Sequence, residues 1–155
     1  MTQPADTGAE ARVGQPQPGA PSTPAAPLEL SLFELPTFAD ARGSLSAIEG
    51  QIDIPFLIRR VFYIFDVPEG ATRASHSVGT VDEVLIALSG SFDVLTVDGA
   101  QRREFSLERP SQGLLIPGHI WRKLTAFSPG AVCMVLASKR YADSDYRPFS
   151  VDPAG

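Results

Sequence analysis

Residues 70–90 read GATRASHSVGTVDEVLIALSG, and the spacing of their glycine, histidine and glutamate residues decides the fold. Five residues separate Gly70 from His76, and Glu83 opens a short apolar run that ends in a turn residue. Such a run is typical of a β-strand. Residues two apart on a strand share a face, so His76 and Val78 are expected to point to the same side of the sheet.

Short β-rich runs separated by turn residues continue on both sides of this stretch. Their spacing of roughly 8–12 residues, with almost no helical periodicity, indicates an antiparallel sandwich or barrel. Asp98 and Gly99 are a strong hairpin signal, and one helical turn is expected within residues 140–149. The other expected strands lie within residues 28–35, 44–49, 59–67, 83–90, 91–97, 101–107, 113–117, 120–127 and 131–139.

The folded part is expected to be one domain, residues 28–150 of the 155-residue chain. Residues 1–27 are rich in Pro, Ala and Gly and contain no aromatic residue, so we predict that they form a disordered extension. They lack a basic start followed by an apolar core, which argues against a secretory signal and predicts a cytoplasmic protein.

Charge and cysteine content exclude several classes of function. The net charge of −5 argues against a surface that binds nucleic-acid phosphates. No apolar run approaches the ~20 residues of a membrane span. The single cysteine, Cys133, lies in the apolar run AVCMVLA and is predicted to be a buried, inert thiol. One cysteine allows neither an intrachain disulfide nor a zinc site built on thiolates.

The spacing from Gly70 to Gly90 resembles the first sequence motif of the cupin β-barrels, apart from the second histidine of its His-x-His pair, which is Val78 here. The resemblance implies an all-β fold: a single cupin-type antiparallel β-barrel, or jelly roll. The second cupin motif resembles GLLIPGHIWRK (113–123), where the position of its histidine is held by Arg122.

Two of the four usual cupin metal positions are therefore kept, as His76 and Glu83, and two are Val78 and Arg122. Valine has no donor atom and a guanidinium repels a cation, so we expect no bound metal. His119 would complete a set of two histidines and one carboxylate if it turned inward, but it belongs to the expected turn.

Four further blocks carry a more specific resemblance: RGSLSAIEG (42–50), IPFLIRRVFYIFDVPEG (54–70), LIALSGSFDV (85–94) and GLLIPGHIWRKL with FSPGAVCMVLAS (113–138). They are similar to the nucleotide-linked sugar 3,4-ketoisomerases, metal-free cupins that act on dTDP-4-keto-6-deoxyglucose. The central segment of that family is typically Arg-Gly-Gly-His-Ala-His, whereas residues 73–78 read RASHSV.

The resemblance implies a proton-transfer enzyme without a cofactor. Moving a ketone from C4 to C3 requires removal of the C3 proton, passage through an enediol and reprotonation at C4. A histidine with a pKa near 7 suits the base, which makes His76 the expected principal base. Tyr63 or His119 is expected to carry the second proton.

The same resemblance implies a dTDP-linked sugar as the ligand. Arg60, Arg73 and Arg122 would hold its pyrophosphate, because guanidinium groups bind phosphates in a bidentate manner. Trp121 is either a core residue or a platform for the sugar or base. A buried carboxylate needs a partner, so Glu83 is expected to contact His76 or Arg122.

The family also pairs its barrels, and the run LELSLFEL (28–35) has a long apolar face to hide, so we expect a homodimer. The substitution by Val78 leaves two alternatives open. A diverged cupin would bind or cyclise a non-sugar natural-product intermediate in a drier lumen. A non-catalytic protein would only bind sugar nucleotides.

Overall fold

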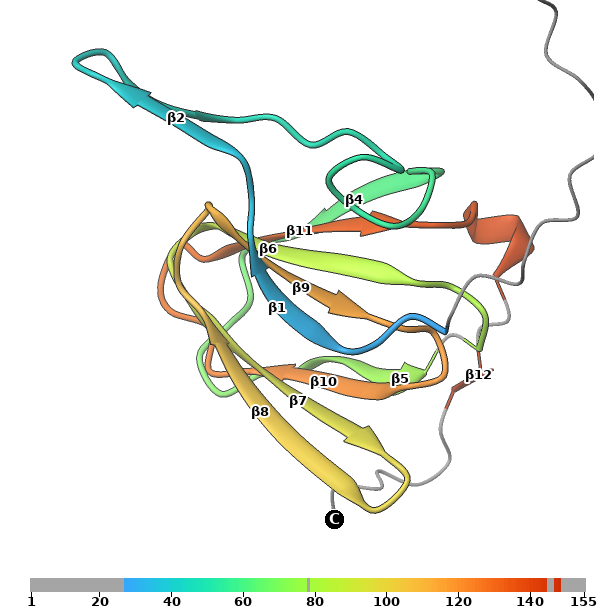
Figure 1. Ribbon diagram of the computed structural model, residues 1–155. Helices are drawn as coiled ribbons and strands as arrows, with labels where there is room; N and C mark the ends of the chain where they lie inside the picture. The colour runs from blue at the N-terminus through green and yellow to red at the C-terminus, as the bar shows by residue number, and fades with distance from the viewer. Residues whose placement is uncertain (1–26, 78, 145–146, 149–155) are drawn as a thin grey trace, which may run out of the picture.

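A computed structural model of the chain describes residues 27–77, 79–144 and 147–148. They form two five-stranded sheets and a separate two-stranded hairpin (Figure 1), in which all strands pair antiparallel. This architecture confirms the predicted all-β, cupin-type jelly roll. The first sheet has the order β1-β9-β6-β11-β4 and the second β12-β5-β10-β7-β8. The elements are β1 (Ser31–Glu34), β2 (Thr37–Asp40), β3 (Gly43–Ser46), β4 (Arg60–Ile64), β5 (Arg73–Ser77), β6 (Glu83–Ser89), β7 (Phe92–Asp98), β8 (Gln101–Leu107), β9 (Gln112–Ile116), β10 (Trp121–Thr125), β11 (Val132–Ala137), the 3-10 turn η1 (Tyr141–Asp143) and β12 (Arg147–Pro148).

The main core fills the space between the two sheets. Leu85 and Cys133 from the first sheet join Val94 and Leu124 from the second in one buried apolar cluster. Cys133 is a buried free thiol, as predicted. Strand residues alternate between the two faces of a sheet, so every second residue of β6 and β11 enters this core.

A second core covers the outer face of the first sheet. Val84 and Ile86 of β6 pack there with Leu136 of β11, beneath Ile54 and Phe56 from the connection between β3 and β4. Strand β6 is therefore buried on both faces, which explains why its sequence is a continuous apolar run instead of an alternating one.

The local turn signals of the sequence match the observed strand ends with small differences. Asp98 lies in β7 and pairs with Gln101, so the hairpin turn is formed by Gly99 and Ala100, and Gly99 takes a φ of +56°. The predicted strand over 59–67 ends earlier, at Ile64. The expected helical turn is η1, and β2 was not expected from the pattern.

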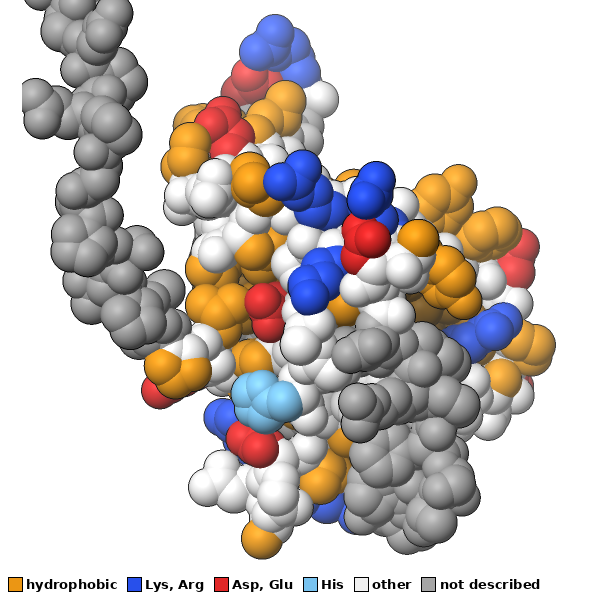
Figure 2. Space-filling view, turned by 90° about the vertical axis from the view of Figure 1, so that its right-hand side faces the viewer, with side chains coloured by type: hydrophobic (Ala, Val, Ile, Leu, Met, Phe, Trp, Pro, Cys, Tyr) orange, Lys and Arg blue, Asp and Glu red, His pale blue; other side chains and the backbone are white. Residues whose placement is uncertain are grey.

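Lysine and arginine side chains gather at the end of the barrel where β11 finishes and η1 begins (Figure 2). Arg59, Lys139 and Arg140 line a shallow hollow there, together with Asp143. This basic group does not line the cavity described below.

Two predictions concern residues outside the described part of the chain. The extension predicted over residues 1–27 lies there except for its last residue, and so does Val78. Among the residues that the structure describes, no helix is long and apolar enough to cross a membrane.

Candidate active site

A cavity of ≈ 340 Å³ lies in the barrel lumen and is bordered by β4, β5, β6, β10 and β11. Its walls are mainly apolar and consist of Phe62, Ile64, Phe65, Ala74, Leu85, Leu124 and Val135. Its polar groups are Tyr63, Arg73, His76, Glu83 and Arg122. The two cupin-like segments therefore meet in the lumen, as their spacing predicts.

An irregularity in β5 brings His76 to this cavity. His76 pairs with Arg122 of β10, whereas Arg73 pairs with Leu124, so the register shifts between the two pairs. Ala74 lies inside the shift and has a φ of +55°, a left-handed conformation that a non-glycine residue rarely adopts. A bulge of this kind re-aims the side chains that follow it.

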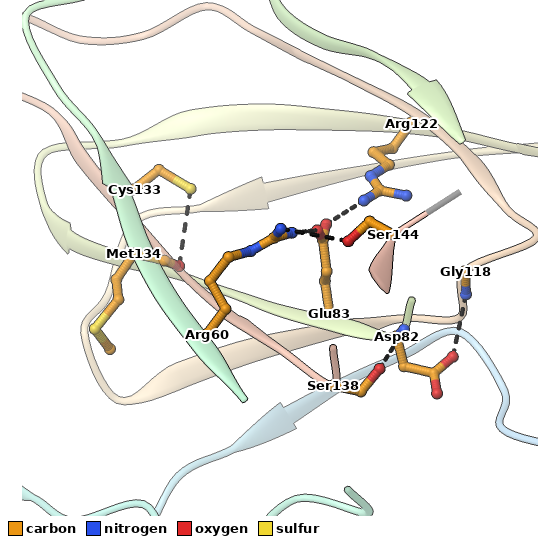
Figure 3. A network of polar contacts seen from close by, with 9 residues as sticks. All are labelled: Arg60, Asp82, Glu83, Gly118, Arg122, Cys133, Met134, Ser138 and Ser144. Carbon is orange, nitrogen blue, oxygen red and sulfur yellow. Dashed lines mark hydrogen bonds and ion pairs between the residues drawn. The ribbon is translucent and has the colours of Figure 1, made fainter. Parts of the chain in front are cut away.

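A buried ion pair forms the floor of the cavity. Nη2 of Arg122 donates a hydrogen bond to Oε2 of Glu83, and the Arg122 side chain is only 1% exposed (Figure 3). The predicted contact between Glu83 and Arg122 is therefore confirmed. It neutralises a carboxylate that would be costly to bury alone.

Arg60 reaches Glu83 from the opposite side (Figure 3). Its Nη2 lies 3.8 Å from Oε1 of Glu83, and its Nη1 donates a hydrogen bond of 3.4 Å to Oγ of Ser144. The guanidinium also stacks over the rings of Phe62 and Tyr141. Arg60 does not line the cavity, so its expected role in holding a pyrophosphate is not supported by its position.

The start of β6, and with it Glu83, is fixed by contacts of Asp82. The N–H of Asp82 donates to Oγ of Ser138 at 2.9 Å, and Oδ1 of Asp82 accepts from the N–H of Gly118 at 3.1 Å (Figure 3). A Cβ atom at position 118 would lie 2.5 Å from the backbone nitrogen of Val81. Glycine is therefore required at the Pro-Gly turn, because only it lets the two loops approach so closely.

His76 is half-buried beside this ion pair. Burial, and secondly the positive charge of Arg122, lower the pKa of His76 to about 4. The expectation of a base with a pKa near 7 is therefore wrong. The physical reason is the dry, positively charged floor, which disfavours the imidazolium. His76 is neutral at pH 7 and can accept a proton.

The negative charge of Glu83 also acts on Cys133. Burial, with Glu83 as the second cause, raises the pKa of the Cys133 thiol well above its usual range. A thiol of this kind is not a nucleophile, in agreement with the prediction from the sequence.

Arg73 lines the cavity with an exposed side chain, which places it at the mouth. Tyr63 borders the same mouth from β4, the edge strand of the first sheet. It pairs with Met134 of the second core, whereas its neighbours Phe62 and Ile64 face the lumen. Tyr63 packs against Phe65, with ring centroids 5.5 Å apart and the ring planes tilted by 35°. Of the three arginines expected to bind a pyrophosphate, Arg73 is the one that is both exposed and at the cavity.

His119 and Trp121 lie outside the cavity, which corrects the expected role of His119 and, for Trp121, favours the core residue over the platform. His119 is exposed in the turn between β9 and β10, and its Nε2 lies 4.0 Å from Oδ1 of Asp98. Trp121 is buried but does not line the cavity, since it precedes Arg122 on β10 and neighbouring strand residues face opposite sides. Neither residue is placed to act on a ligand in the lumen.

Comparisons with known proteins agree with this geometry. Residues 28–149 match the family described as FdtA: WxcM-like, C-terminal. The chain is 39% identical over 119 residues to the TDP-4-oxo-6-deoxy-alpha-D-glucose-3,4-oxoisomerase of Aneurinibacillus thermoaerophilus, covering 77% of this chain and 86% of that protein. The chain belongs to this family of 3,4-ketoisomerases. It is therefore an isomerase.

Solved structures of related enzymes show the same fold. The sugar 3,4-ketoisomerase QdtA from Thermoanaerobacterium thermosaccharolyticum, in complex with TDP, is 39% identical, with a TM-score of 0.75, over 78% of this chain and 88% of QdtA. A histidine-to-asparagine mutant of QdtA, in complex with TDP-4-keto-6-deoxyglucose, is 38% identical, with a TM-score of 0.71, over 74% and 83%.

The positions that hold a metal ion in other cupins do not form a metal site among the described residues of this ketoisomerase. Within the described residues, no three His, Cys, Asp or Glu side chains are grouped so that they could hold a metal ion. Arg122 and Glu83 are instead bonded to each other. The fourth position, Val78, lies outside the described residues.

Two members of the site could not be singled out from the sequence. Ser144, which bonds to Arg60, follows a turn that carries no motif. Ala74 occupies a left-handed position that glycine normally holds; the residue itself does not indicate the bulge, and the only signal is the glycine that the resembled family has at this place. Together the site offers a neutral base, an apolar enclosure and a buried positive group, which suits removal of a proton from carbon.

Proposed function

We propose that the chain converts a dTDP-linked 4-keto-6-deoxy sugar into its 3-keto isomer, with dTDP-4-keto-6-deoxyglucose as the substrate. The observation that carries the proposal is a neutral, half-buried His76 beside the Arg122–Glu83 pair in a cavity of the barrel lumen. Support comes from the 39% identical oxoisomerase and from the related enzyme bound to TDP-4-keto-6-deoxyglucose.

The proposed reaction needs only proton transfers. His76 accepts the C3 proton, and the electron pair of the C3–H bond forms the C3–C4 double bond of the enediol. Return of a proton to C4 leaves the carbonyl group at C3, so atoms and electrons balance without an oxidant or reductant. Tyr63, at the mouth, carries the proton between the two sugar oxygens in this proposal.

The nucleotide half of the substrate occupies the cavity mouth in this proposal. Arg73 is the exposed cation there and binds the diphosphate. Phe65 is a half-exposed aromatic side chain at the same mouth, so it offers an apolar surface for the base or the sugar. The sugar then extends inward to His76.

Exchange of the C3 proton of dTDP-4-keto-6-deoxyglucose into deuterated water, followed by NMR, tests the proposal. Replacing the base by His76→Asn is expected to slow exchange by ~10²–10⁴-fold. His119→Asn, the same substitution on an exposed histidine outside the lumen, is expected to retain the wild-type rate. A wild-type protein without exchange refutes the function, and an undiminished rate in His76→Asn refutes the base.

Valine at position 78, where the family typically has its second histidine, favours one alternative function: a diverged cupin that acts on an apolar ligand. The apolar walls Phe62, Leu85 and Val135 favour it as well. If the chain is a ketoisomerase, Val78→His restores the family's second histidine and should hold or raise the exchange rate. In the alternative, the wild type shows no exchange and a polar ring in the lumen damages the native activity.

We also propose that the chain forms a homodimer, for a different reason from the one expected. The run over 28–35 hides most of its apolar face within its own chain, since Leu30 and Leu35 are buried and Phe33 packs on the second core. The hairpin β2–β3 projects from the barrel instead (Figure 1), and its paired Phe38 and Leu45 are exposed. A cytoplasmic location remains a prediction.

A further inference from the structure

The polar group at the floor of the cavity carries one positive charge more than it can neutralise internally. Glu83 supplies one negative charge, and Arg60 and Arg122 each supply a positive one. Arg60 disperses its charge over the rings of Phe62 and Tyr141. Arg122 has no aromatic partner of this kind in the described part of the chain, and its charge faces the lumen.

Half of the Arg122 guanidinium is also left without a hydrogen bond. Its Nη2 is bonded to Glu83, but its Nη1 is buried and has no hydrogen-bond partner among the described residues. The side chain is 1% exposed and lines the cavity, so this donor is buried beside the space that a ligand would fill. Buried donors are nearly always paired, and an unpaired one in a cavity indicates a ligand atom.

We propose that Arg122 is a catalytic residue whose Nη1 binds the carbonyl oxygen of the keto sugar and stabilises the negative charge that this oxygen gains in the enediolate. The inference rests on the proposed function and assigns a second chemical role to the same lumen. His76 pairs with Arg122 across β5 and β10, so the base and the cation face the same ligand from neighbouring strands.

The charge on the oxygen arises in a defined step. When His76 removes the C3 proton, the electron pair of the C3–H bond becomes the new C3–C4 double bond. The π electrons of the C4 carbonyl then move onto O4, which becomes an oxyanion. Arg122 cannot supply a proton, because a guanidinium stays charged at any ordinary pH. Its contribution is therefore electrostatic, like that of the donors in an oxyanion hole.

Glu83 and Arg60 are positioning residues in this arrangement. Glu83 holds Nη2 of Arg122, a residue that lines the cavity, and this bond leaves Nη1 as the donor without a protein partner in the described part of the chain. Arg60, itself bonded to Ser144, holds the other oxygen of Glu83. A donor fixed in this way needs little reorganisation when the charge develops.

Arg122→Lys and Arg122→Ala test the proposal, with Arg109→Lys as the matched control. Arg109 also pairs with a glutamate, Glu34, but both side chains are exposed and neither lines the cavity. Each variant is measured for C3 proton exchange, for kcat and for the Kd of dTDP, which has no keto group. Arg122→Ala is expected to lower kcat by ~10²–10³-fold, the usual loss for one oxyanion donor, with the Kd of dTDP unchanged.

Added guanidinium chloride at low concentration provides a readout that a merely structural role would not move. It is expected to raise the exchange rate of Arg122→Ala and to leave the wild type and Arg109→Lys unchanged. Arg122→Lys keeps a positive charge beside Glu83, so it is the variant to use if Arg122→Ala does not fold. It is expected to lose part of kcat without weakening dTDP binding.

The outcomes separate this inference from the function on which it rests. A wild-type protein that exchanges no C3 proton refutes both. Normal exchange in the wild type with an unchanged kcat in folded Arg122 variants refutes the inference alone. The same holds if the variants lose dTDP affinity and kcat together and guanidinium restores neither, because Arg122 would then only maintain the fold.

Discussion

The positive charge of Arg122 has opposite effects on the two partners of the proposed proton transfer. It lowers the pKa of His76, which makes the imidazole a weaker base. In the proposed reaction it also stabilises the enediolate, which makes the C3 proton easier to remove. The buried side chain of Arg122 thus helps to keep the base His76 neutral and, in the proposed reaction, also supplies the positive charge that stabilises the enediolate.

The lowered pKa of His76 predicts the pH dependence of the reaction. Below about pH 4 His76 carries a proton and cannot accept another. The value of kcat/KM should therefore fall below about pH 4 and should not change around pH 6.5. Among the described residues, the other titratable or charged side chains that border the same cavity are Tyr63, Arg73, Glu83 and Arg122. An acid limb near 6.5 in the kcat/KM profile would contradict this prediction.

The free energy of unfolding should also depend on pH because of His76. The unfolded chain binds a proton at His76 near pH 6.5, whereas the folded chain does so only near 4. Between these values the unfolded state binds more protons, so this contribution to stability falls as the pH decreases. Urea unfolding of the wild type and His76→Asn between pH 4 and 7 measures it, and the variant should show a weaker dependence.

At the scale of the element, the bulge in β5 is the feature on which the site depends. It places His76 opposite Arg122, and it holds Ala74 in a left-handed conformation. The strain at such an alanine is about 1–2 kcal/mol. Glycine would remove this strain, but the greater backbone entropy of glycine in the unfolded chain would destabilise the fold by about 0.5–1 kcal/mol.

Ala74→Gly is therefore expected to stabilise the fold by up to about 1 kcal/mol, as measured by urea unfolding. Ala39→Gly is the matched control, because Ala39 lies exposed in β2 and has no positive φ. It should destabilise by about 0.5–1 kcal/mol. Equal losses in the two variants would show that the conformation of Ala74 is not strained.

Elements that are determined by residues close together in the sequence could be predicted, whereas those that depend on distant residues could not. Most strands and the hairpin at Gly99 depend on neighbouring residues, and the pattern located them, apart from β2 and from the exact turn, which is Gly99–Ala100. The pairing of Glu83 with Arg122 was also expected, because both fall on motif positions that face the lumen. The lining of the cavity depends on single-residue alternation, and this alternation decides between the two alternatives for Trp121, which lies one residue before Arg122 and is a core residue.

Other parts of the site depend on contacts that no local pattern contains. Arg60 was expected at a pyrophosphate, but Glu83 and the rings of Phe62 and Tyr141 draw it beneath the cavity. The low pKa of His76 arises from burial and from a charge on another strand. Neither effect is visible before the two cupin-like segments are brought together.

At the scale of the whole molecule, the first sheet has a second apolar layer that its own chain covers only in part. The connection between β3 and β4 buries one end of the outer face. A groove of ≈ 350 Å³ remains beside the hairpin and is lined by Ile48, Ile86, Leu88 and Met134, among others. Thr37 and three serines also line it, so the groove is mixed in polarity, and we expect the second copy of the proposed homodimer to cover it together with the hairpin.

The exposed hairpin predicts how the proposed homodimer can be broken. Phe38 and Leu45 face each other across β2 and β3 and are 68% and 61% exposed, so a second copy would bury both. Phe38→Asp places a charge in that contact and is expected to give a monomer of 16.6 kDa in sedimentation velocity at micromolar concentration. Phe38→Leu, the control, keeps an apolar side chain and should remain a dimer. A wild type that sediments as a monomer would refute the dimer itself, whereas a dimeric Phe38→Asp would move its interface away from the hairpin.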